Sequence, residues 1–137
     1  MPSRFGSVIA TRKLHTAGPR QGEVTISLAK PTREPGGDWV CRFRIEGLGC
    51  QRLNFAHGVD AFQALQLALE AIRLMIDESG RKLTWVEAGR AGFPRYVPSY
   101  FGPVFERRLN RHIDREVLRF ARAQERRYKA RTRSRTR

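Results

Sequence analysis

The sequence is poor in cysteine, in acidic residues and in long apolar runs. Only two of its 137 residues are cysteine, too few for a disulfide framework. No stretch approaches the roughly 18 consecutive apolar residues of a transmembrane helix. Residues 1–10, MPSRFGSVIA, lack the apolar core of a secretory signal. These absences predict a cytoplasmic protein that does not insert into a membrane.

Motifs for catalysis, metal binding and cofactor binding are also missing. The histidines, His15, His57 and His112, are scattered, and the sequence has no C-x-x-C pair and no glycine-rich phosphate loop. A nucleophile built from Cys41 or Cys50 with His57 is disfavoured, because Cys41 is expected to face the core, where burial raises the pKa of a thiol. The sequence therefore predicts no metal, no cofactor and no enzyme activity.

Positive charge is in large excess and is concentrated at the C-terminal end. The chain has 27 Arg and Lys residues against 13 Asp and Glu residues, a formal net charge of +14. Residues 103–137 hold 13 of the basic residues and 4 of the acidic ones, so the rest of the chain is only mildly basic. This balance predicts a polyanionic partner, such as nucleic acid, an acidic membrane surface or an acidic protein.

Residues 1–91 have the pattern of one α+β domain. The stretch EVTISLAK alternates apolar and polar residues, as a half-buried strand does. Asp60 followed by Gln63 is typical of a helix start, and Gly80 of a helix end. We expect a four- or five-stranded, mostly antiparallel sheet packed by one central helix. The expected strands are 8–15, 23–30, 39–45, 50–56 and 82–89, and the expected helix is 59–80.

The hairpin formed by residues 39–56 has a predicted register. A turn centred near residue 48 would pair Phe43 with Leu53. Cys41 would then pair with Phe55, and all four side chains would share the apolar face. Cys50 would lie far from Cys41 in this register, so no disulfide bond is expected between them.

The remaining residues are predicted to form a connector, a helix and a tail. Segment 92–103 has three prolines and four aromatic residues, a composition that excludes a regular helix. Across residues 104–128 apolar residues recur every three or four positions and basic residues fill the other side, which predicts a long amphipathic basic helix. Residues 129–137 have no large apolar residue and are expected to form a disordered, Arg-rich tail.

Four segments resemble a family of small bacterial proteins of unknown function. They are GDWVCRFRI at 37–45, GVDAFQALQLALEAI at 58–72, LTW at 83–85 and GFP at 92–94. The resemblance covers roughly residues 23–94 and implies a sheet, a G-x-D-x-x-Q-A-L-x-L-A-L helix and a closing Trp strand. Some similar proteins lie beside toxin genes in the manner of immunity proteins, which implies a protein partner. The basic end beyond residue 104 is outside this pattern.

The candidate binding residues form three groups. The first contains the cations at the end of the chain, since Arg presents a planar fork that suits phosphate: Arg122, Arg126, Arg127, Lys129, Arg131, Arg133, Arg135 and Arg137. The second contains Arg42, Arg44 and Arg52 on the outer side of the hairpin, which are either an anion-binding patch or solvated side chains beside carboxylates such as Glu46. The third contains Phe93, Tyr96, Tyr100 and Phe101, which either stack on bases or contact a partner, or only pin the connector to the core.

Two functional hypotheses follow. The first, which the resemblance favours, is a non-enzymatic binding protein that docks a protein partner, as an immunity-like inhibitor does. The second, which the composition favours, is an accessory protein that binds DNA or RNA with its Arg-rich C-terminal helix and tail. The first is preferred because the front domain makes up most of the chain. The oligomeric state is left open.

Overall fold

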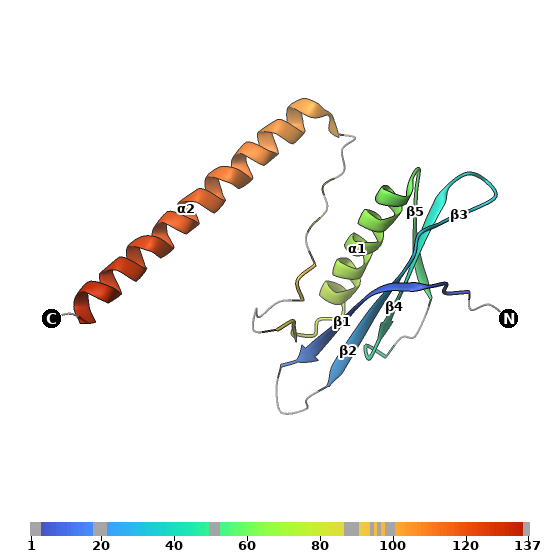
Figure 1. Ribbon diagram of the computed structural model, residues 1–137, viewed down its shortest axis with the longest axis horizontal. Coiled ribbons are helices and arrows are strands. Elements are labelled where there is room, and N and C mark those ends of the chain that lie inside the picture. The colour runs from blue at the N-terminus through green and yellow to red at the C-terminus, as the bar shows by residue number, and fades with distance from the viewer. Residues whose placement is uncertain are drawn as a thin grey trace. The chain divides into compact units, whose positions relative to one another are not determined.

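The computed structural model describes residues 4–17, 22–49, 53–86, 91–93, 95, 97 and 101–135. The chain divides into two compact units, Met1–Tyr96 and Val97–Arg137, which we call the front unit and the C-terminal unit. The front unit contains a β-sheet and helix α1, and the C-terminal unit contains helix α2 (Figure 1). The elements are β1 (Val8–Thr16), β2 (Glu23–Ala29), β3 (Thr32–Arg33), β4 (Trp39–Glu46), β5 (Asn54–Gly58), α1 (Ala61–Glu78), β6 (Leu83–Thr84) and α2 (Pro103–Arg135).

The sheet is antiparallel throughout its described strands. β4 is its centre: β5 pairs with one edge of β4, and β2 and β3 both pair with the other. β1 follows β2, and the short β6 pairs with β1. β2 and β3 lie along one line that is interrupted at Pro31, a residue with no backbone N–H for the ladder. The predicted α+β class is confirmed, with six strands because this interruption divides the second strand.

The core lies between α1 and one face of the sheet (Figure 1). Alternate residues of the strands point into it, as the period of two in a pleated strand requires. α1 contributes a row of residues spaced by four, and its small alanines let the helix come close to the sheet. The core contains Leu14, Val24, Ile26, Leu28, Cys41, Phe43 and Ile45 of the sheet, Ala64, Ala68, Ile72 and Ile76 of α1, and Leu83.

Helix α1 has the capping residues that the sequence predicts, and is two residues shorter at each end than the predicted 59–80. The side chain of Asp60 accepts a hydrogen bond of 2.7 Å from the backbone N–H of Gln63. The side chain of Gln63 in turn accepts a hydrogen bond of 2.8 Å from the backbone N–H of Val59. The first bond satisfies a donor that the first turn of a helix leaves unpaired, and the second holds the residue before the cap against the helix. At the other end Gly80 has φ +67°, a left-handed conformation that suits glycine after a helix.

The predicted register of the β4–β5 hairpin is wrong by one residue. Phe43 pairs with Asn54, and Cys41 pairs with Ala56. Phe55 therefore points away from the core and is 57% exposed. The reason is the close approach of α1 to Gly58, where an added Cβ would lie 2.3 Å from the backbone nitrogen of Ala64. Because residues two apart share a face, the small residues of β5 must be the ones that face α1.

Replacing Gly58 by alanine is expected to destabilise the protein by about 1–3 kcal/mol, since the new methyl group would overlap the backbone of α1. The matched control is Gly36→Ala in the β3–β4 turn, where an added Cβ meets nothing within 4 Å. The free energy of unfolding, measured with urea, should fall for Gly58→Ala and stay within about 0.5 kcal/mol of the parent for Gly36→Ala. Equal effects of the two substitutions would contradict the packing of β5 under α1.

Candidate nucleic-acid interface

Helix α2 is longer than the sequence predicts. It runs from Pro103 through Arg135, so the expected disordered tail at 129–137 is wrong for residues 129–135. No glycine or further proline follows Pro103, and Arg, Lys and Ala are all strong helix formers. An ion pair of 2.7 Å between Lys129 and Glu125 adds local support at a spacing of four. Local helix propensity therefore outweighs the lack of apolar anchors.

The cations of α2 form a straight line, which we call the cation stripe. Its eight members follow one another at spacings of 3, 4, 4, 3, 4, 3 and 4 residues: Arg108, Arg111, Arg115, Arg119, Arg122, Arg126, Lys129 and Arg133. These spacings average about 3.6 residues, the repeat of an α-helix, so the stripe does not wind around the helix. It is about 38 Å long at 1.5 Å per residue. The sequence-based candidate set lacks its first four members, because acidic residues are interspersed among them and none follows Glu125.

Acidic residues neutralise only part of this helix. α2 holds 12 Arg and Lys residues against 4 Asp and Glu residues. Within the stripe, Arg119 pairs with Glu116 at 3.5 Å, and Lys129 pairs with Glu125. These pairs are exposed, so each contributes little to stability and leaves its cation accessible. Of the other cations predicted from the sequence, Arg127, Arg131 and Arg135 lie off the stripe, and Arg137 lies outside the described residues.

A band of apolar residues about 120° wide at 100° per residue lies on another side of α2, its centre about 140° from that of the cation stripe. We call it the apolar stripe: Phe105, Leu109, Ile113, Val117 and Phe120. In the C-terminal unit no described residue of α2 is buried, and Val117 and Phe120 are among its most exposed apolar residues. The helix thus presents two different surfaces, one cationic and one apolar.

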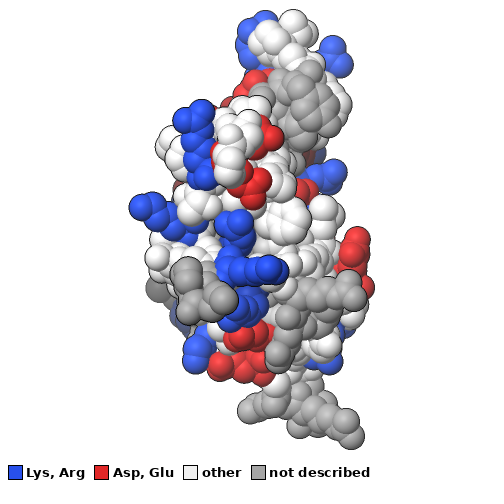
Figure 2. Space-filling model, turned by 90° about the vertical axis from the view of Figure 1, so that its right-hand side faces the viewer, with Lys and Arg blue, Asp and Glu red and all other residues white. Residues whose placement is uncertain are grey.

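The second candidate group lies on the outer face of the sheet. Arg42 donates a hydrogen bond of 3.1 Å to Thr32 and lies 3.7 Å from the Glu34 carboxylate, which also contacts His57 at 3.2 Å. Arg44 lies 3.7 Å from Glu46, the partner predicted for this patch. Figure 2 shows basic side chains gathered near the middle of one face with acidic side chains beside them. Arg52 lies outside the described residues. Arg42 and Arg44 are thus partly neutralised, and α2, with 12 basic against 4 acidic residues, is the stronger candidate for an interface.

The aromatic candidates do not form one cluster in the described residues. Phe93 is half-buried and packs against the guanidinium group of Arg12, 4.7 Å from its ring centre. Phe101 is exposed and contacts Phe105 at 5.2 Å between ring centres. Tyr96 and Tyr100 lie outside the described residues. Phe93 is therefore part of the front-unit packing, and Phe101 extends the apolar stripe.

The chemistry of Cys41 agrees with the sequence-based prediction. Its side chain is fully buried, and its Sγ lies 3.5 Å from the carbonyl oxygen of Ala29. Burial raises the pKa of the Cys41 thiol to about 11, because the thiolate loses its hydration. Among the described residues no group of three or more His, Cys, Asp or Glu is arranged to hold a metal ion. No described helix is long and apolar enough to cross a bilayer.

Cys41 is expected to resist alkylation in the folded protein. At pH 8 a shift of its pKa from 9.0 to about 11 lowers the thiolate fraction roughly a hundredfold, and burial slows the reaction further. The measurement is the rate of iodoacetamide labelling of a Cys50→Ser chain, folded and in urea. Similar rates in the two conditions would contradict the buried position of Cys41.

The front unit is a small antiparallel sheet covered by one helix, and the C-terminal unit is a single exposed basic helix. A family model described as a domain of unknown function (DUF6968) matches residues 10–95, which is more than half of the chain. The protein therefore belongs to this family. The matched segment ends before α2, so the cation stripe lies outside the family domain. No curated protein and no solved structure matches the chain.

Proposed function

We propose that this is a non-enzymatic binding protein that binds nucleic acid through the cation stripe of α2. The alignment of eight cations along one side of an exposed helix is the observation that supports this function best. The stripe is about as long as one turn of B-DNA, which is 34–36 Å. A helix of this kind can contact the phosphates of both strands where it crosses a groove.

The proposed binding depends on charge and not on base sequence. Arg and Lys side chains that contact phosphates release condensed counterions, which gives affinity and steep salt dependence but no information about bases. Beyond Arg126 the helix is basic on several sides, with Arg127, Arg131 and Arg135 off the stripe. The cations at this end of α2 can contact phosphates that lie beyond the reach of the cation stripe.

A pair of charge-matched variants tests the stripe. The first replaces four of its members, Arg111, Arg115, Arg122 and Arg126, by Gln. The second replaces four cations elsewhere on α2, Arg107, Arg127, Arg131 and Arg135, by Gln. Both lose the same charge and keep good helix formers. Binding to a labelled duplex is measured across a salt series. The slope of log K against log salt should fall by about 3–4 for the first variant and clearly less for the second.

Two outcomes would contradict the proposal. If the parent does not bind duplex DNA or RNA at physiological salt, α2 is not a nucleic-acid interface. If both variants lower the slope equally, the binding reflects diffuse charge and not the stripe. Circular dichroism of both variants should show the parent helix content, which separates a lost contact from a lost helix.

The apolar stripe supports a second candidate function, docking of a protein partner in the manner of an immunity-like inhibitor. Its exposed Phe side chains belong to the aromatic class that is enriched at protein interfaces. Coexpression with the protein encoded beside the gene should give a complex that Phe105→Ser with Val117→Ser weakens at least about tenfold. The stripe variant with four Gln residues should leave this complex intact. Loss of the complex only in that Gln variant would count against docking by the apolar stripe.

A further inference from the structure

The front unit has a cleft of about 720 Å³ on the flank of α1. Its lining comes from the C-terminal half of α1, the turn that follows, β6 and the segment around Phe93. Ile76 and Leu83 provide an apolar floor, since both belong to the core, and Phe93 adds an aromatic side chain. A volume of this size is within the range of small-molecule sites, about 300–1,000 Å³.

One wall of the cleft is fixed by a stack around Arg12. The Arg12 guanidinium lies 3.9 Å from the ring centre of Trp85 and 4.7 Å from that of Phe93, and it donates a hydrogen bond of 2.8 Å to the carbonyl oxygen of Gly92. An added Cβ at Gly92 would lie 2.5 Å from the Trp85 ring, and its φ is +77°. Only glycine suits this position. The LTW and GFP segments therefore meet at Arg12 and hold Phe93 at the cleft.

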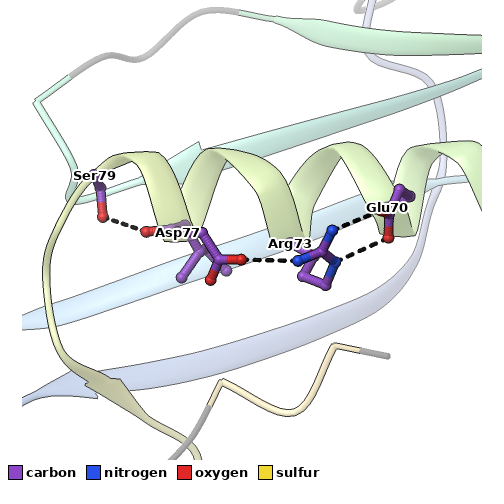
Figure 3. Close-up of polar contacts among 5 residues, drawn as sticks. Glu70, Arg73, Asp77 and Ser79 are labelled. Carbon is purple, nitrogen blue, oxygen red and sulfur yellow. Dashed lines mark hydrogen bonds and ion pairs between the residues drawn. The ribbon is translucent and has the colours of Figure 1, made fainter. Parts of the chain in front are cut away.

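The rim of the cleft is cationic. Arg73 is held by Glu70 at 2.6 Å and Asp77 at 2.8 Å, so its charge is compensated within α1 (Figure 3). These bonds raise the pKa of Arg73, chiefly through the hydrogen bond with Glu70. Lys82 and Arg95 also line the cleft, are exposed, and make no ion pair with the described residues. A cation without a carboxylate partner is available for an anionic ligand.

We propose that this cleft binds a nucleotide phosphate. An apolar floor with one aromatic side chain suits a base, and Lys82 and Arg95 at the rim suit a phosphate. Arg81, which donates a hydrogen bond of 3.0 Å to the carbonyl oxygen of Gly47, adds a third cation at a fixed position. The source of the phosphate is either a free mononucleotide or the phosphorylated end of a nucleic-acid chain. The lining of the site includes no residue of α2, and the proposal does not depend on the function proposed for the cation stripe.

The test is a calorimetric titration of the full chain with AMP, adenosine and inorganic phosphate. AMP should bind at least about tenfold more tightly than adenosine, because charge-assisted bonds to the phosphate add affinity. The double substitution Lys82→Gln with Arg95→Gln should weaken AMP binding at least about tenfold. The matched control Lys30→Gln with Arg33→Gln removes the same charge outside the cleft and should leave AMP affinity within about twofold.

Three results would overturn the site: no AMP binding in the millimolar range, equal affinity for AMP and adenosine, or unchanged AMP affinity in the cleft variant.

A 5′-phosphorylated tetranucleotide identifies the source of the bound phosphate. It is titrated into the chain whose four stripe cations are replaced by Gln, so that α2 contributes little. Competition with AMP by the phosphorylated tetranucleotide, and not by its 5′-hydroxyl form, assigns the site to a chain end. No competition by either form assigns it to a free nucleotide.

Discussion

The close approach of α1 to β5 at Gly58 is the constraint on which the front unit depends. An added Cβ there would meet the backbone of Gln63 and Ala64 at less than 3 Å, so any larger residue must displace α1 from β5. The same contact fixes the register of β5, and with it the outward position of Phe55. α1 is thereby held over β4 and β5, and its opposite flank, with Arg73 and Asp77, borders the cleft.

The sequence predicts those parts of the fold that local patterns encode. Alternation in residues 23–30 and the Asp60–Gln63 pair were sufficient to place a strand and the start of α1, because neither depends on distant residues. The register of β5 was not predictable in this way. Either of two sets of alternate residues, Leu53 with Phe55 or Asn54 with Ala56, could face the core. The steric limit at Gly58 decides between them, and it becomes visible only when α1 is in place.

The candidate sites also differ in how far local sequence patterns predict them. Cations in α2 are evident from composition, but their alignment requires an unbroken helix through Arg133, and low hydropathy predicted disorder there instead. The cleft is not predictable from local patterns, because Arg12 is far in the chain from Trp85 and Phe93 and meets them only where β1 pairs with β6. The cation stripe and the apolar stripe are two surfaces of α2. The two proposed functions, binding of phosphates and docking of a protein, therefore use different side chains.

The most direct test of the proposed function is an NMR titration that follows the Nε–Hε signals of the arginine side chains as a short duplex is added. Binding along the cation stripe predicts large shifts for Arg108, Arg111, Arg115, Arg119, Arg122, Arg126 and Arg133. It also predicts small shifts for Arg42 and Arg44, which belong to β4 of the front unit and not to α2. Large shifts confined to Arg42 and Arg44, with the stripe arginines unchanged, would contradict it and move the interface to the outer face of the sheet.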